Sequence, residues 1–195
     1  MSNSKLVTYT RISPNKTVNR NHKIDTITIH HMAGNCSIEA CGEIFANKRT
    51  QASSNYGIGS DGRIAMYVEE KDRSWCSSSP SNDHRAITIE VANIGSAAQG
   101  WPISKKAYRS LIKLLVDICE RNDIPKLLWK NNKKLIGKVS KQNMTVHCWF
   151  KDKVCPGPYL MKHMKKIAKE VNAELKANKA KKRTVKKTAT KKAVE

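Results

Sequence analysis

The chain has 195 residues and a formal net charge of +21, with 39% hydrophobic and 27% charged residues. A chain of this length can bury a hydrophobic core, and a single folded domain is expected. It contains no run of 18 apolar residues, which excludes a transmembrane helix, and no apolar signal segment follows its N-terminus, so secretory export is not expected. The charge indicates an anionic partner, and the possible classes of partner are nucleic acid, anionic lipid and acidic wall polymers.

Hydrophobic periodicity predicts a mixture of strands and helices. Strands are expected over residues 24–31, 55–60, 63–68, 86–92 and 144–149, where β-branched apolar residues alternate with polar ones. Helices are expected over residues 37–48, 104–121 and 158–175, with a serine at the start of the first two. The pair Asp61-Gly62 predicts a hairpin turn between the second and third strands. The serine-rich segment 75–83 and the basic segment 126–141 are expected to be irregular.

The composition changes after Leu175. Residues 176–195 carry nine basic side chains and one acidic one. Such a segment has too little apolar surface to offset its chain entropy, so we expect one folded domain over residues 1–175 and a basic disordered tail or linker over residues 176–195. The tail could link to a wall-binding domain, attract anionic wall polymers or bind nucleic acid, and the first two are favoured.

Three of the predicted strands carry a polar side chain near their C-terminal end. Every second side chain of a strand lies on the same face. The alternation places His30, Glu90 and His147 on the polar faces of three strands, opposite apolar faces that can pack on helices. If these strands are neighbours, the three side chains meet at one edge of the sheet. Cys155 follows His147 by eight residues and lies within reach of the same point.

This combination predicts a zinc site with hydrolytic chemistry. His30, His147 and Cys155 are residue types that bind Zn2+, and three protein ligands leave the fourth position open for water. Glu90 could accept the proton of that water, and Lys153 could stabilise the oxyanion of a tetrahedral intermediate. The implied reaction is hydrolysis of an amide or an ester.

The same residues resemble a known family. The matching segments, in family order across roughly residues 20–175, are 28–34 (TIHHMAG), 54–62 (SNYGIGSDG), 87–90 (ITIE) and 147–158. They resemble the zinc-dependent N-acetylmuramoyl-L-alanine amidases of the type-2 amidase and peptidoglycan-recognition-protein superfamily, as found in phage endolysins. The spacing from histidine to cysteine, with a lysine two residues before the cysteine, is the most specific match.

The resemblance implies an α/β (α+β) fold in which a central mixed β-sheet is flanked by α-helices. It implies one zinc ion on His30, His147 and Cys155, and it implies that Glu90 and Lys153 form the catalytic pair. The implied substrate is bacterial peptidoglycan, cleaved at the amide between the lactyl group of N-acetylmuramic acid and the L-alanine of the stem peptide.

Two positions depart from the family pattern. Some members carry a tyrosine in the first strand of the hairpin where this chain has Ser54, and Tyr56, two residues later, is retained as a substrate contact. Many members carry a histidine after the tryptophan that follows the hairpin, and here Trp75 is followed by Cys76. Trp75 is the second expected substrate contact. The candidates for lining a sugar-binding groove, with core packing as the alternative, are Trp75, Trp101 and Trp149.

Several alternatives stay open from the sequence. His31 could replace His30 as the metal ligand, and Cys36 could pair with Cys41 in an oxidising medium, although the thiols are expected to be reduced where the protein is made. A peptidoglycan-binding module without catalysis and a basic nucleic-acid-binding protein are the rival functions. The favoured prediction is a monomeric phage or prophage endolysin, made in the cytoplasm without a signal peptide, which lyses the bacterial cell wall after its release.

Overall fold

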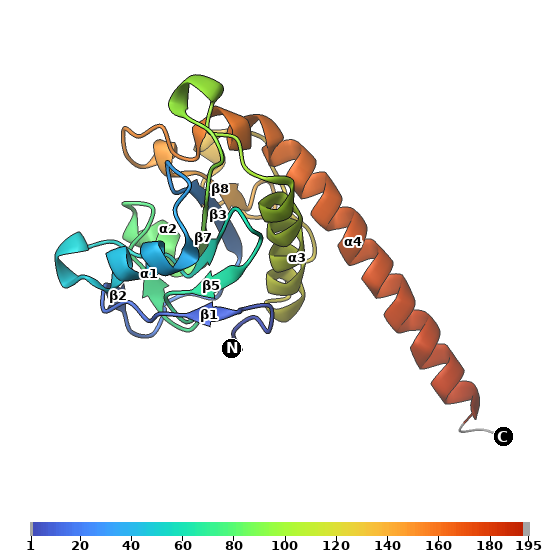
Figure 1. The fold of residues 1–195 in the computed structure, drawn as a ribbon. Coiled ribbons are helices and arrows are strands. Elements are labelled where there is room, and N and C mark those ends of the chain that lie inside the picture. Colours follow the sequence, from blue (N-terminus) through green and yellow to red (C-terminus); the bar gives the residue numbers. More distant parts are fainter. Residues whose placement is uncertain (1, 193–195) are drawn as a thin grey trace.

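A mixed six-stranded sheet forms the centre of the computed structural model, which describes residues 2–192 (Figure 1). The strands lie in the order β1-β5-β4-β7-β3-β8. Their bounds are Tyr9–Thr10 (β1), Ile64–Met66 (β5), Tyr56–Ile58 (β4), Ala86–Val91 (β7), Thr26–His31 (β3) and Met144–Thr145 (β8). A second, two-stranded sheet pairs β2 (Lys16–Thr17) with β6 (Arg73–Ser74).

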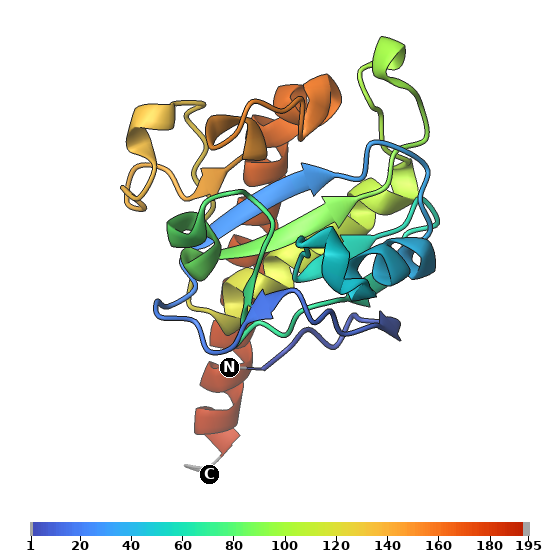
Figure 2. The ribbon, with the colours of Figure 1, turned by 90° about the vertical axis from the view of Figure 1, so that its left-hand side faces the viewer.

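Helices flank both faces of the central sheet, as expected for an α/β (α+β) protein (Figures 1 and 2). The α-helices are α1 (Ile38–Ala46), α2 (Pro80–Arg85), α3 (Lys105–Arg121) and α4 (Gly157–Lys192). Short 3-10 helices are η1 (Lys48–Thr50), η2 (Ala97–Gln99), η3 (Lys133–Leu135) and η4 (His147–Trp149). Within residues 2–192, no helix combines the length and the apolar character that crossing a membrane requires.

The two central strands β3 and β7 set the position of the site. They are parallel, and their register places His30 opposite Glu90. Ile29 and Ile89, one residue earlier on each strand, are fully buried and belong to the hydrophobic core that includes residues of α3 and α4. Because side chains alternate along a strand, this core directs His30 and Glu90 to the opposite face. Parallel strands also end at one edge, so both residues lie at the same edge of the sheet.

The helix starts follow the expected capping chemistry. The Ser37 hydroxyl accepts a hydrogen bond from the Ala40 amide at the start of α1, and the Ser104 hydroxyl accepts one from Ala107 at the start of α3. The N-cap of α2 was not predicted from the sequence. Ser79 caps α2 and Pro80 occupies its first turn, so part of the segment expected to be a loop is helical.

The last expected strand, over residues 144–149, is shorter than the pattern indicated. β8 pairs with β3 through only two residues and lies at the sheet edge. The chain then turns into η4, where the Phe150 amide donates to the His147 carbonyl at 2.9 Å. This turn buries Trp149, whose ring stacks on Trp129 with centroids 5.1 Å apart. The prediction of a strand through residue 149 is therefore wrong, and His147 lies on a turn.

Helix α4 is longer than expected and projects beyond the rest of the fold (Figure 1). The prediction of a disordered tail is wrong over residues 176–192, which are helical, whereas residues 193–195 lie outside the described part. Two causes are visible: the segment is rich in alanine and lysine, which favour helices, and no glycine or proline follows Pro158. Asn178 and Lys182 also contact the Glu120 carboxylate of α3, at 3.2 and 3.3 Å.

Deletion of residues 176–195 is expected to leave the folded domain intact. Glu120 and Lys182 form a partly exposed ion pair, and such contacts contribute about 1 kcal/mol or less. The melting temperature, followed by circular dichroism, should fall by no more than about 4 °C. The full-length Glu120→Gln variant is the control because it weakens the same contacts without removing the tail. A fall of about 10 °C or more on deletion would show that the tail is part of the domain.

Candidate active site

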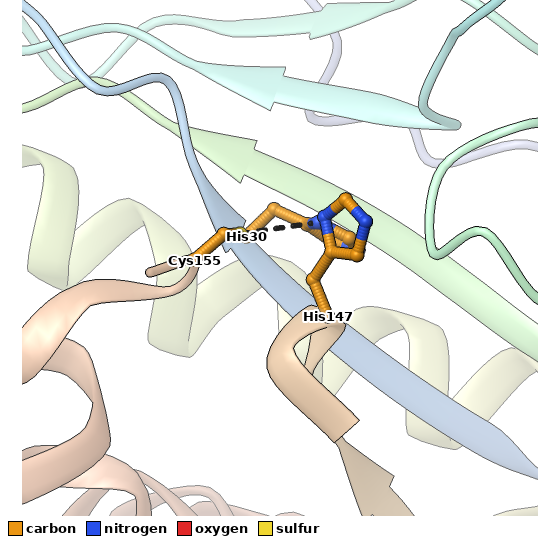
Figure 3. A group of neighbouring side chains, drawn as sticks. All are labelled: His30, His147 and Cys155. Atoms are coloured by element: carbon orange, nitrogen blue, oxygen red, sulfur yellow. Dashed lines mark hydrogen bonds between the residues drawn. The ribbon is translucent and has the colours of Figure 1, made fainter. Parts of the chain in front are cut away.

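Three side chains from separate segments converge at the edge of the sheet (Figure 3). His30 comes from the end of β3, His147 from η4, and Cys155 from the loop before α4. Their metal-binding atoms all lie within 4.8 Å of one another. The Cys155 sulfur lies 3.3 Å from His30 Nδ1, and the two imidazole rings have centroids 5.1 Å apart.

The donor atoms fit a tetrahedral zinc ion. Zinc bonds of about 2.0 Å to nitrogen and 2.3 Å to sulfur place neighbouring ligand atoms about 3.5 Å apart, close to the spacing of His30 and Cys155. Burial lowers the pKa of His30 well below its usual value, and burial and the Lys153 charge lower the pKa of His147. Both rings are therefore neutral near pH 7, and a neutral ring has the lone pair that a metal needs.

Glu90 borders this cluster with an unpaired carboxylate oxygen. Its Oε1 lies 3.9 Å from His30 Nδ1 and 3.9 Å from the Cys76 sulfur. Its Oε2 is buried, and no hydrogen-bond donor among residues 2–192 reaches it. Burial raises the pKa of Glu90 to about 8, against a small lowering by Cys76. A buried carboxylate oxygen without a partner is costly and marks a functional position.

Lys153 lies at the surface of the loop between His147 and Cys155. Its charge lowers the pKa of His147 and of Cys155, although burial is the largest influence on both groups and leaves the pKa of Cys155 raised. The structure therefore places the ammonium group near two of the three candidate ligands. Lys153 and Glu90 belong to different segments on the border of the cluster.

His31 is not part of the cluster. Its ring lies on the face opposite to His30 and contacts Trp101 edge-on, with centroids 5.3 Å apart. Its backbone amide instead supports the site, because it donates toward the Cys155 sulfur and counteracts the rise in the pKa of that thiol. Of the two neighbouring histidines, His30 is the one whose ring lies among the candidate donor atoms.

Two neighbours of the cluster received no role from the sequence. The Ser78 hydroxyl lies 3.1 Å from His147 Nε2 and can fix the orientation of that ring. Cys76 forms a second group of donor atoms with His30 and Glu90, again within 4.8 Å of one another. In the sequence, the only indication that Cys76 lies near the site is its position directly after Trp75. No feature of the sequence indicates Ser78.

The prediction that Tyr56 contacts substrate is wrong. Tyr56 is fully buried in β4, and its hydroxyl donates to Glu70 Oε1 at 2.6 Å and accepts from the Ser4 amide at 3.0 Å. The side chain therefore ties the N-terminal segment to the core. Ser54, the neighbouring departure from the family pattern, is also buried and donates to the Tyr56 carbonyl.

The Tyr56→Phe variant is expected to lose stability and keep its activity. It removes a buried hydroxyl with two partners, which should destabilise the fold by about 1–2 kcal/mol. Thermal unfolding and turnover are the two measurements, and Tyr9→Phe, on a half-buried ring of β1, is the control. A loss of turnover at unchanged stability would show instead that Tyr56 contributes to substrate binding or catalysis.

The remaining candidates are distributed between core and surface. Trp75 is half-buried and its Nε1 donates to Thr17 Oγ1 at 3.0 Å, so its role as a substrate contact stays a prediction. Trp149 packs in the core. Cys36 and Cys41 are both free thiols in this structure.

The fold and the cluster together define a class: a protein with a mixed β-sheet flanked by helices, a His-His-Cys candidate metal site and an adjacent carboxylate. A family model described as N-acetylmuramoyl-L-alanine amidase matches residues 20–158, and the chain belongs to this family. It is a peptidoglycan amidase, the class that cleaves between N-acetylmuramic acid and the L-alanine of the stem peptide. A comparison of the sequence with curated proteins finds no match.

Solved structures confirm the fold. The chain is similar to PlyL, at 14% identity and a TM-score of 0.58, over 84% of this chain and 95% of that one. It is similar to a selenomethionine derivative of AmpD, at 18% identity and a TM-score of 0.58, over 82% and 94%. It is also similar to the endolysin amidase LysCS from Clostridium intestinale, at 20% identity and a TM-score of 0.53, over 82% and 91%.

Proposed function

We propose that this amidase uses one zinc ion, bound by His30, His147 and Cys155, with Glu90 as general base and Lys153 as the oxyanion-stabilising group. One observation carries the proposal: two imidazoles and a cysteine from three segments converge beside a buried carboxylate oxygen that has no hydrogen-bond partner among residues 2–192. Such a carboxylate can accept a proton during the reaction.

Each side chain has a defined task in this mechanism. When bound, zinc supplies a Lewis acid that polarises the substrate carbonyl and acidifies a water molecule. Glu90 accepts a proton from the attacking water and delivers it to the departing amino group of L-alanine, which converts that group into a good leaving group. Burial raises the pKa of Glu90 to about 8, which strengthens its carboxylate as a proton acceptor. Lys153 stabilises the negative charge that develops on the carbonyl oxygen.

The Lys153→Ala variant is expected to lower kcat about a hundredfold with little change in bound zinc. The loss follows from removing one charge that acts on the oxyanion. Turnover on purified peptidoglycan and zinc content are the measurements. Lys151→Ala is the matched control, because Lys151 is also exposed on the same loop. Equal rates in the two variants would remove Lys153 from the mechanism.

We further propose that lysis of the bacterial cell wall is the biological outcome, with a phage- or prophage-encoded protein made in the cytoplasm and released to the wall. The likeness to structures described as endolysins supports this. The lysine-rich part of α4 after residue 175 would attract anionic wall polymers to a monomeric enzyme.

Digestion of purified peptidoglycan tests the reaction. With the protein added, new amino ends of stem peptides should appear without new reducing sugar ends, and a chelator should prevent this. New reducing ends would identify a different bond. Bound peptidoglycan without any new ends would favour a binding module, and salt-sensitive binding of DNA without wall digestion would favour a nucleic-acid-binding protein.

A further inference from the structure

A cavity of about 440 Å³ adjoins the candidate metal site. Residues from three loops line it, among them Ala33, Ala97, Trp101, Lys153, Val154 and Cys155. The cavity shares Lys153 and Cys155 with the candidate active site, and His31 and Pro158 complete its lining. Its walls are otherwise mostly apolar, and Trp101 is the largest side chain among them.

The backbone holds Trp101 in an unusual conformation. Its φ of 59° lies in the left-handed region, which costs a residue other than glycine about 1–3 kcal/mol. Two hydrogen bonds hold it there: the Asn93 side chain donates to the Trp101 carbonyl at 2.8 Å, and the Trp101 amide donates to the Ser96 carbonyl at 3.1 Å. The loop that carries it projects beyond the ends of β3 and β7 (Figure 2).

The indole ring is supported from the protein side. The His31 ring meets it edge-on, with centroids 5.3 Å apart and planes at 66°. Gly157 also lies against it, since a Cβ atom at this glycine would come within 3.1 Å of the Trp101 Cβ. The side chain remains half-exposed where it lines the cavity. A ring fixed by its backbone and by two neighbours, and open on the cavity, is a preorganised binding surface.

We propose that Trp101 is the stacking platform for the N-acetylmuramic acid ring next to the cleaved amide, an inference that rests on the proposed function. The apolar face of a sugar ring packs well on an indole, and a cavity of this volume holds one sugar residue. The methyl group of L-alanine is too small to fill it. Lys153 is the only lysine or arginine in the lining, so the carboxylates of the stem peptide find few partners there.

Kinetics separate this binding role from a catalytic one. Trp101→Ala is expected to raise KM for a muramoyl-peptide substrate about tenfold or more, with kcat and zinc content near those of the wild type. Trp101→Phe, which keeps an aromatic face and disturbs the loop less, should recover part of the loss. Trp129→Phe is the control, because Trp129 is another half-buried indole and stacks on Trp149. An unchanged KM in both Trp101 variants would overturn the proposal.

Direct binding tests the same point without any hydrolysis. Tryptophan fluorescence is titrated with a peptide-free N-acetylglucosaminyl-N-acetylmuramic acid disaccharide and, separately, with a sugar-free stem peptide. The disaccharide should quench the wild type and Trp129→Phe but not Trp101→Phe. Quenching of Trp101 by the stem peptide, with none by the disaccharide, would overturn the proposal. Because this readout needs no turnover, a protein that binds the sugar without hydrolysing peptidoglycan would refute the proposed function and leave the platform standing.

Discussion

The Glu90→Gln variant is expected to lower kcat about a thousandfold while the protein keeps its fold and its zinc. Glutamine has nearly the same shape as glutamate but cannot accept the proton of the attacking water, and general base catalysis contributes about 10²–10⁴-fold. The measurement is turnover on purified peptidoglycan together with the zinc content of the purified variant. Because the buried Glu90 Oε2 has no hydrogen-bond partner among residues 2–192, the substitution breaks no hydrogen bond of that atom, and the melting temperature should not fall.

A matched control is available on the same protein. Glu69→Gln changes a partly exposed carboxylate that pairs with Lys71 and belongs to neither group of donor atoms, and it should leave turnover unchanged. Unchanged turnover in Glu90→Gln would remove this residue from the mechanism. A loss of zinc together with the loss of activity would show instead that Glu90 acts as a metal ligand, in line with its membership in the second donor group with His30 and Cys76.

The strand alternation predicted the two central strands and the side chains they deliver to the site. Ile29 and Ile89 face the core, and His30 and Glu90 face away from it, as the period of two requires. The sequence does not reveal which strands are neighbours, and the register that sets His30 opposite Glu90 is known only from the structure. His147 lies close to His30, as expected, but it belongs to a turn rather than to a strand.

The features that the sequence did not predict depend on contacts between distant segments. Tyr56 is a core residue because its hydroxyl meets the amide of Ser4 and the carboxylate of Glu70, neither of which is near it in the chain. Periodicity describes the face of one strand and contains no information about such partners. Composition likewise indicated disorder after Leu175, whereas the helix propensity of the same residues continues α4. The position of Cys76 beside Glu90 also follows from tertiary packing alone.

Replacement of the candidate thiolate ligand should affect both activity and stability. Cys155→Ser substitutes a hydroxyl that stays protonated near pH 7, so only two strong protein ligands would remain for zinc. We expect loss of bound zinc and a fall in turnover of about a thousandfold or more. The ligands come from β3, η4 and the loop before α4, so metal binding would link three segments and stabilise the folded state.

Chelation provides the comparison that makes this result specific. Zinc at about a thousand times its dissociation constant would stabilise the fold by about 4 kcal/mol, which corresponds to roughly 10 °C in melting temperature. The wild type should lose this increment on chelation, and Cys155→Ser should melt at the lower temperature with or without chelator. Cys148→Ser, at a half-buried thiol that lies outside both donor groups, should respond like the wild type. If Cys155→Ser still binds one zinc ion and still responds to chelator, the metal is held without Cys155, and the neighbouring thiol of Cys76 becomes the first ligand to test.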